Sequence, residues 1–337
     1  MRRILVTGGA GFIGSNFVRM VLSEHPDCLV VNLDKLTYAG NLENLAEFVN
    51  HPNHKFVKGD ICDGKLIDKI IDEHGIDTII NFAAESHVDR SISEPKIFID
   101  TNVTGTLTLL EAARDKSIER FIQVSTDEVY GALGPEGMFT EQTSLSPNSP
   151  YSASKASADL LVRAFGHTWG LKYNITRCSN NYGQYQFPEK LIPLMINNAL
   201  NDQELPVYGD GMQVRDWLYV YDHCTAIWRV LEKAPPSEIY NIGGCNEKPN
   251  LEVISLILQC LDKPKSLIRH VTDRLGHDRR YAIDASKIID QLGWRPSVDF
   301  EQGIKRTIDW YLHNSDWLKN VVSGDYQKYY ESMYSNR

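Results

Sequence analysis

Arg3-Ile4-Leu5-Val6-Thr7-Gly8-Gly9-Ala10-Gly11-Phe12-Ile13-Gly14 is the stretch from which the fold can be read. The apolar run over residues 3–7 predicts a strand that is buried on both faces. The glycines that follow allow the backbone to turn tightly and to approach a pyrophosphate, and a helix that starts there offers free N–H groups. This combination predicts a dinucleotide-binding turn.

The chain after this turn supports the same interpretation. An apolar helical pattern runs through residues 17–22, and a second apolar run over residues 29–33 predicts the next strand. That strand ends at Asp34, 20 positions after Gly14, which is the spacing at which a carboxylate receives the ribose hydroxyls of a dinucleotide. Because a carboxylate repels a 2′-phosphate, the sequence favours NAD over NADP.

Strands and helices continue to alternate over the first half of the chain. Strands are expected over residues 55–60, 78–84, 121–124 and 173–177, and helices over 101–115 and from Tyr151 to about residue 169. Repeated βα units predict a Rossmann-type, doubly wound parallel sheet in an α/β protein. Beyond residue 177 we expect a loop at 180–183, strands at 214–220 and 239–242, and helices at 187–201, 222–231, 251–261 and 300–312.

These patterns predict two domains. Residues 1–177 are expected to form the NAD-binding domain, with returning segments near 221–242 and 283–292. Residues 178–220 and 243–337 are expected to form most of a smaller, discontinuous α/β domain that binds the substrate.

The composition argues against several classes of protein. The net charge of −9 without a basic run is unlike a nucleic-acid-binding surface. The six cysteines show no C-x-x-C spacing and are expected to be reduced, as in a cytoplasmic protein. The first strand begins at Arg3, which leaves no room for a signal peptide, and no apolar run approaches the roughly 18 residues of a membrane span. The histidines lack metal-ligand spacing, so no metal site is expected.

A second group of residues predicts proton-transfer chemistry. The strand at 121–124 is followed by Ser125-Thr126-Asp127-Glu128, where a parallel strand delivers a ligand-binding end. Further on, Tyr151 and Lys155 stand four residues apart at the start of a helical pattern, so both lie on one helix face. A lysine ammonium there can stabilise a tyrosinate and lower the pKa of the phenol.

With these motifs in view, the sequence resembles the extended short-chain dehydrogenase/reductases over nearly its whole length. Gly8-x-x-Gly11-x-x-Gly14 and Tyr151-x-x-x-Lys155 carry the general resemblance. A narrower resemblance, to sugar-nucleotide 4,6-dehydratases that act on dTDP-glucose, rests on residues 34–41 (DKLTYAGN), 83–91 (AAESHVDRS), 125–131 (STDEVYG), 187–193 (FPEKLIP), 214–220 (VRDWLYV) and 276–281 (GHDRRY). Epimerases and decarboxylases of the same family share the tyrosine and lysine but do not normally carry an Asp-Glu pair after the catalytic hydroxyl.

The resemblance implies a set of site residues. The catalytic residues would be Thr126, Asp127, Glu128, Tyr151 and Lys155. NAD would be held by Gly8, Gly11, Phe12, Ile13, Gly14, Asp34, Lys35, Thr37, Asp60, Ile61, Ala83, Ala84, Ser86, Thr101, Ser125, Tyr151, Lys155 and Asn180. The sugar nucleotide would be held by Ser86, Thr126, Asn181, Glu189, Lys190, Leu191, Arg215, Asn250, Arg274, His277 and Tyr281.

The implied reaction is oxidation at C4 of the sugar, elimination of water across C5 and C6, and return of the hydride to C6. In it Tyr151 is the first base, and Asp127 and Glu128 share the elimination, with roles that could be exchanged. The alternatives are a UDP-hexose 4-epimerase or decarboxylase, which would leave the acid pair without work, and a non-catalytic NAD-binding regulator, which would need a degraded site. The resemblance further implies a homodimer packed through helices of the first domain.

Overall fold

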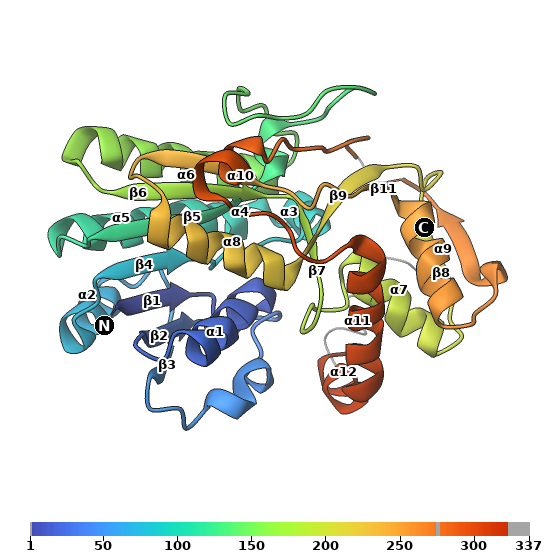
Figure 1. The fold of residues 1–337 in the computed structure, drawn as a ribbon, viewed down its shortest axis with the longest axis horizontal. Helices are drawn as coiled ribbons and strands as arrows, with labels where there is room; N and C mark the ends of the chain where they lie inside the picture. Colours follow the sequence, from blue (N-terminus) through green and yellow to red (C-terminus); the bar gives the residue numbers. More distant parts are fainter. Residues whose placement is uncertain (1, 274–276, 323–337) are drawn as a thin grey trace.

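A computed structural model describes residues 2–273 and 277–322 of the chain, which are built around a seven-stranded parallel sheet (Figure 1). Its strand order is β10-β6-β5-β4-β1-β2-β3. The strands are β1 (Arg3–Thr7), β2 (Leu29–Asp34), β3 (His54–Lys58), β4 (Thr78–Asn81), β5 (Arg120–Thr126), β6 (Tyr173–Cys178) and β10 (Glu238–Ile242). Every pair of neighbours runs parallel, so the carboxyl ends of all seven strands meet at one edge. The predicted Rossmann-type α/β fold is confirmed.

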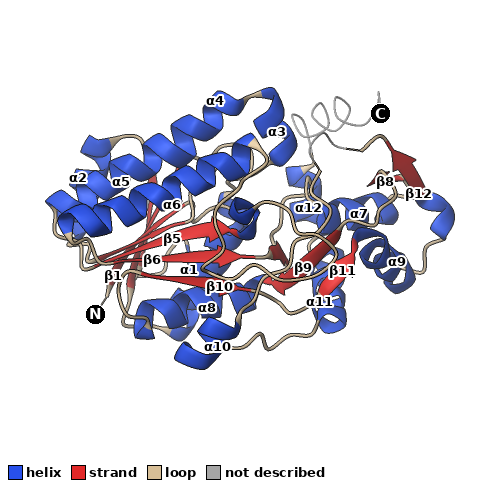
Figure 2. Cartoon of the chain, turned by 90° about the horizontal axis from the view of Figure 1, so that it is seen from above, coloured by secondary structure: helices blue, strands red, loops and turns tan. Residues whose placement is uncertain are grey.

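Helices cover both faces of this sheet, as Figure 2 shows. On one face lie α2 (Gly64–His74), α3 (Val88–Ser93), α4 (Pro95–Phe98), α5 (Thr106–Asp115) and α6 (Pro150–Trp169), and on the other lie α1 (Phe12–Glu24), α8 (Val220–Lys233) and α10 (Ser286–Leu292). Successive strand residues alternate between two apolar cores, so that Ile4 packs with the α1 and α8 side and Leu5 with the α2 and α5 side. Burial on both faces explains why the strands read as continuous apolar runs.

The later part of the chain lies beside the carboxyl ends of the parallel strands (Figure 1). It contains a three-stranded sheet and a two-stranded sheet with their own apolar core. The strands are β7 (Asn180–Tyr182), β8 (Leu205–Tyr208), β9 (Val214–Tyr219), β11 (Glu247–Pro249) and β12 (Ile268–Val271), and the helices are α7 (Leu191–Leu200), α9 (Asn250–Cys260), α11 (Phe300–His313) and α12 (Ser315–Val321). Strand β10 pairs with β6 in the parallel sheet, α10 contacts β10, and α8 contacts β6. The predicted division of the chain into two domains remains a prediction.

Several expected elements differ from the structure. The expected loop at 180–183 is wrong, because residues 180–182 form β7, which pairs with β9. The helix expected from residue 101 instead begins as a π-helical segment (Ile99–Gly105) that continues into α5. The helix expected from residue 187 begins only at Leu191. Strands β8, β11 and β12 were not predicted, because each has only three or four residues and is held by a partner that is distant in sequence.

Candidate active site

One cavity of about 430 Å³ runs from the glycine-rich turn across the ends of β1, β2, β4, β5 and β6 to the second part of the chain. All of the site residues predicted from the sequence line it, except Arg274, which lies outside the described residues. Two arginines of the stretch 276–281 do not line it, since Arg279 pairs with Asp210 and Arg280 pairs with Glu247. The fold therefore brings the two predicted groups of residues to a single site.

The glycine-rich turn forms a close-fitting cradle at one end of this cavity. Gly8 has a φ of +70°, and a Cβ there would lie 2.7 Å from the Ala83 backbone. A Cβ on Gly14 would collide with the carbonyl oxygen of Gly8. Helix α1 starts with Gly11 as its N-cap and has no side-chain cap, so its first N–H groups face the cavity without a competing side-chain acceptor. This arrangement suits a pyrophosphate, and the residues fit NAD.

Asp34 lies beside the cradle with its carboxylate held in place by backbone groups. Its Oδ2 accepts a hydrogen bond from the Ala10 N–H at 2.9 Å, and its Oδ1 accepts one from the Leu36 N–H at 2.8 Å. Burial raises the pKa of this carboxyl, although both hydrogen bonds act in the opposite direction. Next to it, Lys35 pairs with Asp60 at 2.7 Å. The ammonium of the adjacent Lys35 is thus already engaged, which leaves a site suited to neutral ribose hydroxyls.

The acid pair lies at the end of β5, in a single turn of 3-10 helix over Asp127–Tyr130 (η3). The Thr126 hydroxyl caps this turn by accepting from the Glu128 N–H at 3.2 Å, and it donates to Asp127 Oδ1 at 3.3 Å. Asp127 is 2% exposed, and its Oδ2 has no hydrogen-bond partner among the described residues. Burial raises the pKa of Asp127 well above its ordinary value, and the carboxylates of Glu128 and Asp216 raise it further. Glu128 is only partly buried. The two carboxyl groups therefore differ in environment, with Asp127 favoured as the protonated one.

Tyr151 and Lys155 lie in the first turns of α6, which begins with a capping box on Ser149. Lys155 Nζ donates to the Val124 carbonyl oxygen at 2.7 Å, which directs the lysine toward β5. The pKa of Tyr151 is raised well above its ordinary value, first by burial and then by Glu128, and burial lowers the pKa of Lys155. This differs from the expectation that Lys155 lowers the phenol pKa. Two groups buried from water both favour their neutral forms, so a lowered phenol pKa requires further positive charge in the cavity.

The opposite end of the cavity carries the predicted substrate residues from the second part of the chain. Arg215 is buried, donates to the carbonyl oxygens of Val214 and Asp278, and lies 4.3 Å from the Tyr281 ring centroid. Asn250 has a buried Oδ1 without a hydrogen-bond partner among the described residues. A rigidly held guanidinium beside an aromatic ring is suited to an anionic nucleotide.

Glu189, expected to contact substrate, has its carboxylate directed at protein groups. It accepts from the Tyr38 hydroxyl at 3.0 Å and lies 3.7 Å from Arg90, whose guanidinium stacks 3.7 Å above the Tyr38 ring. Its neighbour Lys190 donates to the Ser86 carbonyl oxygen at 2.7 Å. The buried carboxylate of Glu189 therefore connects three stretches that are distant in sequence: residues 34–41, 83–91 and 187–193. Glu189 lines the cavity and also holds these three stretches together.

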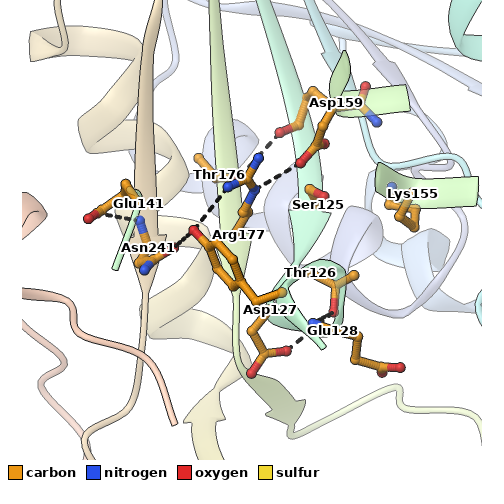
Figure 3. Close-up of polar contacts among 12 residues, drawn as sticks. Ser125, Thr126, Asp127, Glu128, Glu141, Lys155, Asp159, Thr176, Arg177 and Asn241 are labelled. Atoms are coloured by element: carbon orange, nitrogen blue, oxygen red, sulfur yellow. Dashed lines mark hydrogen bonds and ion pairs between the residues drawn. The ribbon is translucent and has the colours of Figure 1, made fainter. Parts of the chain in front are cut away.

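Sequence reasoning missed a buried ion pair near the acid pair, between Asp159 and Arg177, which Figure 3 shows. Asp159 lies one helical step of four residues after Lys155, and it pairs with Arg177 at 2.9 Å. The same periodicity that identified Tyr151 and Lys155 could have found Asp159, and Arg177 could have been noticed as a charge inside a strand that is buried throughout.

Comparisons with known proteins identify the relatives of this chain. Residues 5–307 match the family model described as GDP-mannose 4,6 dehydratase. The chain is 58% identical to a dTDP-glucose 4,6-dehydratase of Xanthomonas campestris pv. campestris (strain B100), over 96% of this chain and 97% of the relative.

Solved structures give the same result. The dTDP-glucose 4,6-dehydratase of Streptomyces venezuelae, with NAD and TYD bound, is 50% identical with a TM-score of 0.92, covering 95% of this chain and 99% of that one. The enzyme of that name from Bacillus anthracis str. Ames, in complex with NAD, is 53% identical with a TM-score of 0.90, covering 95% and 100%. A UDP-glucose 4-epimerase from Thermotoga maritima shares the fold with a TM-score of 0.87, but it is only 30% identical, covering 93% and 99%.

Proposed function

This chain belongs to the dTDP-glucose 4,6-dehydratase family, and we propose from that membership and from the cavity how its own residues carry the reaction. It is an NAD-dependent dehydratase that oxidises C4 of dTDP-glucose, eliminates water across C5 and C6, and returns the hydride to C6. The observation that carries the assignment of residues is a buried Asp127 with a raised pKa beside a partly exposed Glu128, in one cavity with Tyr151 and the dinucleotide cradle.

The oxidation step is assigned to Tyr151, Lys155 and Thr126. NAD, when bound, supplies the hydride acceptor and a positively charged ring. Burial and carboxylate neighbours raise the pKa of the Tyr151 phenol, and the positive charge of bound NAD would lower it. Tyr151 is then the base that removes the proton from O4. Thr126, at the end of β5, hydrogen-bonds O4 and orients the sugar.

The elimination is assigned to the acid pair. Oxidation at C4 makes the C5 proton acidic, and Glu128, the more exposed carboxylate, removes it as general base. Asp127 holds a proton because burial and two carboxylate neighbours disfavour its charged form, and it donates this proton to the departing C6 hydroxyl. The different burial of the two carboxyl groups supports this division of roles over the exchanged one.

Binding of the sugar nucleotide is assigned to residues at the far end of the cavity. Arg215, Lys190 and His277 supply positive or hydrogen-bonding groups to the diphosphate, and Tyr281 packs beside Arg215. Ser86 and Asn181 are placed to approach the sugar or its phosphate. The buried His223 has a pKa lowered to about 3 by burial and contacts Asn181 Oδ1 at 2.9 Å, so a neutral imidazole orients this amide.

We further propose that the chain works as a cytoplasmic homodimer. Exposed apolar side chains gather on helices that contact one another on one face of the sheet: Ile92 on α3, Ile97 on α4, Ile99 at the π-helical segment and Leu160 on α6. Covering these side chains with the same face of a second copy would remove them from water. Light scattering after gel filtration tests the dimer, and Leu160→Glu is expected to shift it toward monomer. No helix within residues 2–273 and 277–322 is long and apolar enough to cross a membrane.

Isotopic labelling tests the proposed reaction. With dTDP-glucose carrying deuterium at C4, the label is expected at C6 of the same sugar, and in heavy water C5 gains a solvent deuteron. A 4-epimerase would return the label to C4 and leave C5 untouched. Label at C4 of the product, or the absence of the alkali-dependent absorbance of a 4-keto sugar, would therefore contradict the dehydratase assignment.

A further inference from the structure

A buried row of side chains on α6 continues past the residues assigned to oxidation. Tyr151, Lys155 and Asp159 are spaced by four residues, so they lie on the same helix face, toward β5 and β6. Asp159 Oδ2 accepts from Arg177 Nε at 2.9 Å, and the two side chains are 0% and 3% exposed. A buried ion pair thus lies one helical turn from Lys155.

This ion pair is connected to the turn that carries the acid pair. Arg177 Nη1 donates to the Tyr130 hydroxyl at 3.0 Å, and that hydroxyl donates to Asn241 Oδ1 at 2.8 Å. Tyr130 is the last residue of η3, three positions after Asp127. Figure 3 shows Asp159, Arg177 and Asn241 in the same region as Thr126, Asp127 and Glu128. The two hydrogen bonds of the Tyr130 hydroxyl connect Arg177 to Asn241 there.

Asn241 fixes the far end of this chain of contacts. Its Nδ2 donates to the Phe139 carbonyl oxygen at 3.0 Å, and its backbone N–H donates to Glu141 Oε1 at 2.8 Å. The Tyr130 ring stacks on the Phe139 ring with centroids 5.0 Å apart. Tyr130 is therefore held by its ring on one side and by its hydroxyl on the other.

Stability alone is a weak reason for such an arrangement. Removing two charges from water is costly, and well-packed apolar residues often serve a fold as well as a buried ion pair does. Here Asp159 Oδ1 also has no hydrogen-bond partner among the described residues, so the pair is incompletely satisfied. What the pair does provide is direction, because hydrogen bonds to a planar guanidinium are sensitive to angle as well as to distance.

We propose that the Asp159–Arg177 ion pair, acting through the Tyr130 hydroxyl, is a positioning element that sets the acid pair in register with Tyr151 and Lys155. The inference rests on the elimination roles proposed above for Asp127 and Glu128. Val129 and Ala156 belong to one apolar cluster, and the turn contacts α6. The hydrogen bond from Arg177 to Tyr130 then sets the rotation of the turn. Asp159, Arg177 and Tyr130 do not themselves take part in proton transfer.

The proposed reaction requires such a positioning element, because two sets of residues must act on one sugar that is bound in a single orientation. Tyr151 acts at O4, whereas the acid pair acts at C5 and at the C6 hydroxyl. A rotation of η3 leaves Tyr151 and Lys155 on α6 in place and displaces Asp127 and Glu128. A fault in the positioning element should therefore appear in the elimination and spare the oxidation.

The variant that tests this is Tyr130→Phe, which keeps the ring stacked on Phe139 and removes the hydroxyl. Its control is Tyr240→Phe. Tyr240 is also buried, and it is the residue before Asn241 on β10. Its hydroxyl donates to Gln291 Oε1 at 3.1 Å, and neither of these two residues lines the cavity. Single turnovers with dTDP-glucose and the NAD-loaded enzyme are followed at the absorbance of reduced nicotinamide. A second variant, Arg177→Lys, keeps the charge and removes the planar fork that reaches both Asp159 and Tyr130.

In Tyr130→Phe the reduced-nicotinamide signal is expected to appear at the unmodified rate and to decay about 10- to 100-fold more slowly, since displacement by about 1 Å can cost ~10²-fold. The concentration of dTDP-glucose that half-saturates the rate of signal appearance should stay unchanged, and Tyr240→Phe should behave as the unmodified enzyme. Equal slowing of appearance and decay, or the same decay in Tyr130→Phe, Arg177→Lys and the unmodified enzyme, would overturn the proposal.

A parallel Asp127→Asn arm separates this inference from the proposed function. If that variant turns over without a persistent reduced-nicotinamide signal, the elimination roles themselves are wrong, whatever Tyr130→Phe does. If the signal persists in Asp127→Asn while Tyr130→Phe decays normally, the elimination roles stand and only the positioning inference falls.

Discussion

Replacement of Asp127 by asparagine should lower activity and raise stability at the same time. The carboxyl group is 2% exposed, and burial together with Glu128 and Asp216 raises its pKa well above the ordinary value. An asparagine is nearly the same shape as a protonated aspartic acid and does not titrate. The substitution therefore removes a transferable proton and leaves the packing intact.

The magnitude on the stability side follows from proton linkage. The pKa of Asp127 is higher in the folded chain than the unfolded value of about 3.9, so between these two pKa values the folded state binds the extra proton. The contribution of Asp127 to the free energy of unfolding is most favourable below the unfolded pKa. As the pH rises above that value, this contribution falls by up to about 1.4 kcal/mol for each pH unit. The asparagine side chain does not titrate. The free energy of unfolding of the Asp127→Asn variant should therefore increase relative to that of the unmodified protein from about pH 4 upward.

On the catalytic side, loss of a general acid typically costs about 10²–10⁴-fold, which corresponds to roughly 2.7–5.4 kcal/mol in the barrier. Denaturation midpoints at pH 5, 6, 7 and 8, both proteins at the same saturating NAD, measure the first effect. Single-turnover formation of the 4-keto sugar measures the second. A variant that is less stable at pH 8, or whose stability changes with pH in parallel with the unmodified protein, would show that Asp127 is ionised in the folded state and would refute the reasoning.

Three further outcomes follow from the site. Tyr151→Phe should abolish oxidation at C4 while nucleotide binding survives; since a general base typically contributes about 10²–10⁴-fold, a loss below about tenfold in single-turnover oxidation would place the base elsewhere. NADP should fail to reactivate apo-enzyme that NAD restores, because its 2′-phosphate would meet the Asp34 carboxylate, and equal recovery with both cofactors would contradict that role. Gly8→Ala should lose bound NAD on gel filtration and melt at a lower temperature, because a left-handed φ of +70° costs a residue with a side chain about 1–3 kcal/mol and the added Cβ would collide with Ala83. A variant that keeps both its cofactor and its melting temperature would contradict the proposed role of Gly8.

The parts of the site that could be predicted are those with a local signal. Glycine spacing, the acidic residue after the second strand and the four-residue step from Tyr151 to Lys155 are each visible within a few dozen positions. The resemblance added the residues of the second part of the chain, and every predicted site residue that the structure describes lines the same cavity. Their individual roles remain proposals.

The parts that could not be predicted depend on partners distant in sequence. Strand β7 is three residues long and has no periodicity of its own, and it is a strand because β9, more than thirty residues later, pairs with it. Glu189 shows the same dependence, because its carboxylate is directed at Tyr38 from the opposite half of the chain. Short segments carry too little local preference to overrule such tertiary contacts.

The sequence by itself determined the alternation of strand and helix and the dinucleotide-binding turn, because these follow from periodicity and glycine spacing. It also predicted a set of proton-transfer groups from side-chain chemistry. Only the tertiary structure decided how those groups ionise. The pKa of Asp127 rises because the fold buries it and brings Asp216 near, and the pKa of Tyr151 rises rather than falls because burial outweighs its neighbours. Desolvation and Coulomb interaction act through space, so residues far apart in the chain set them.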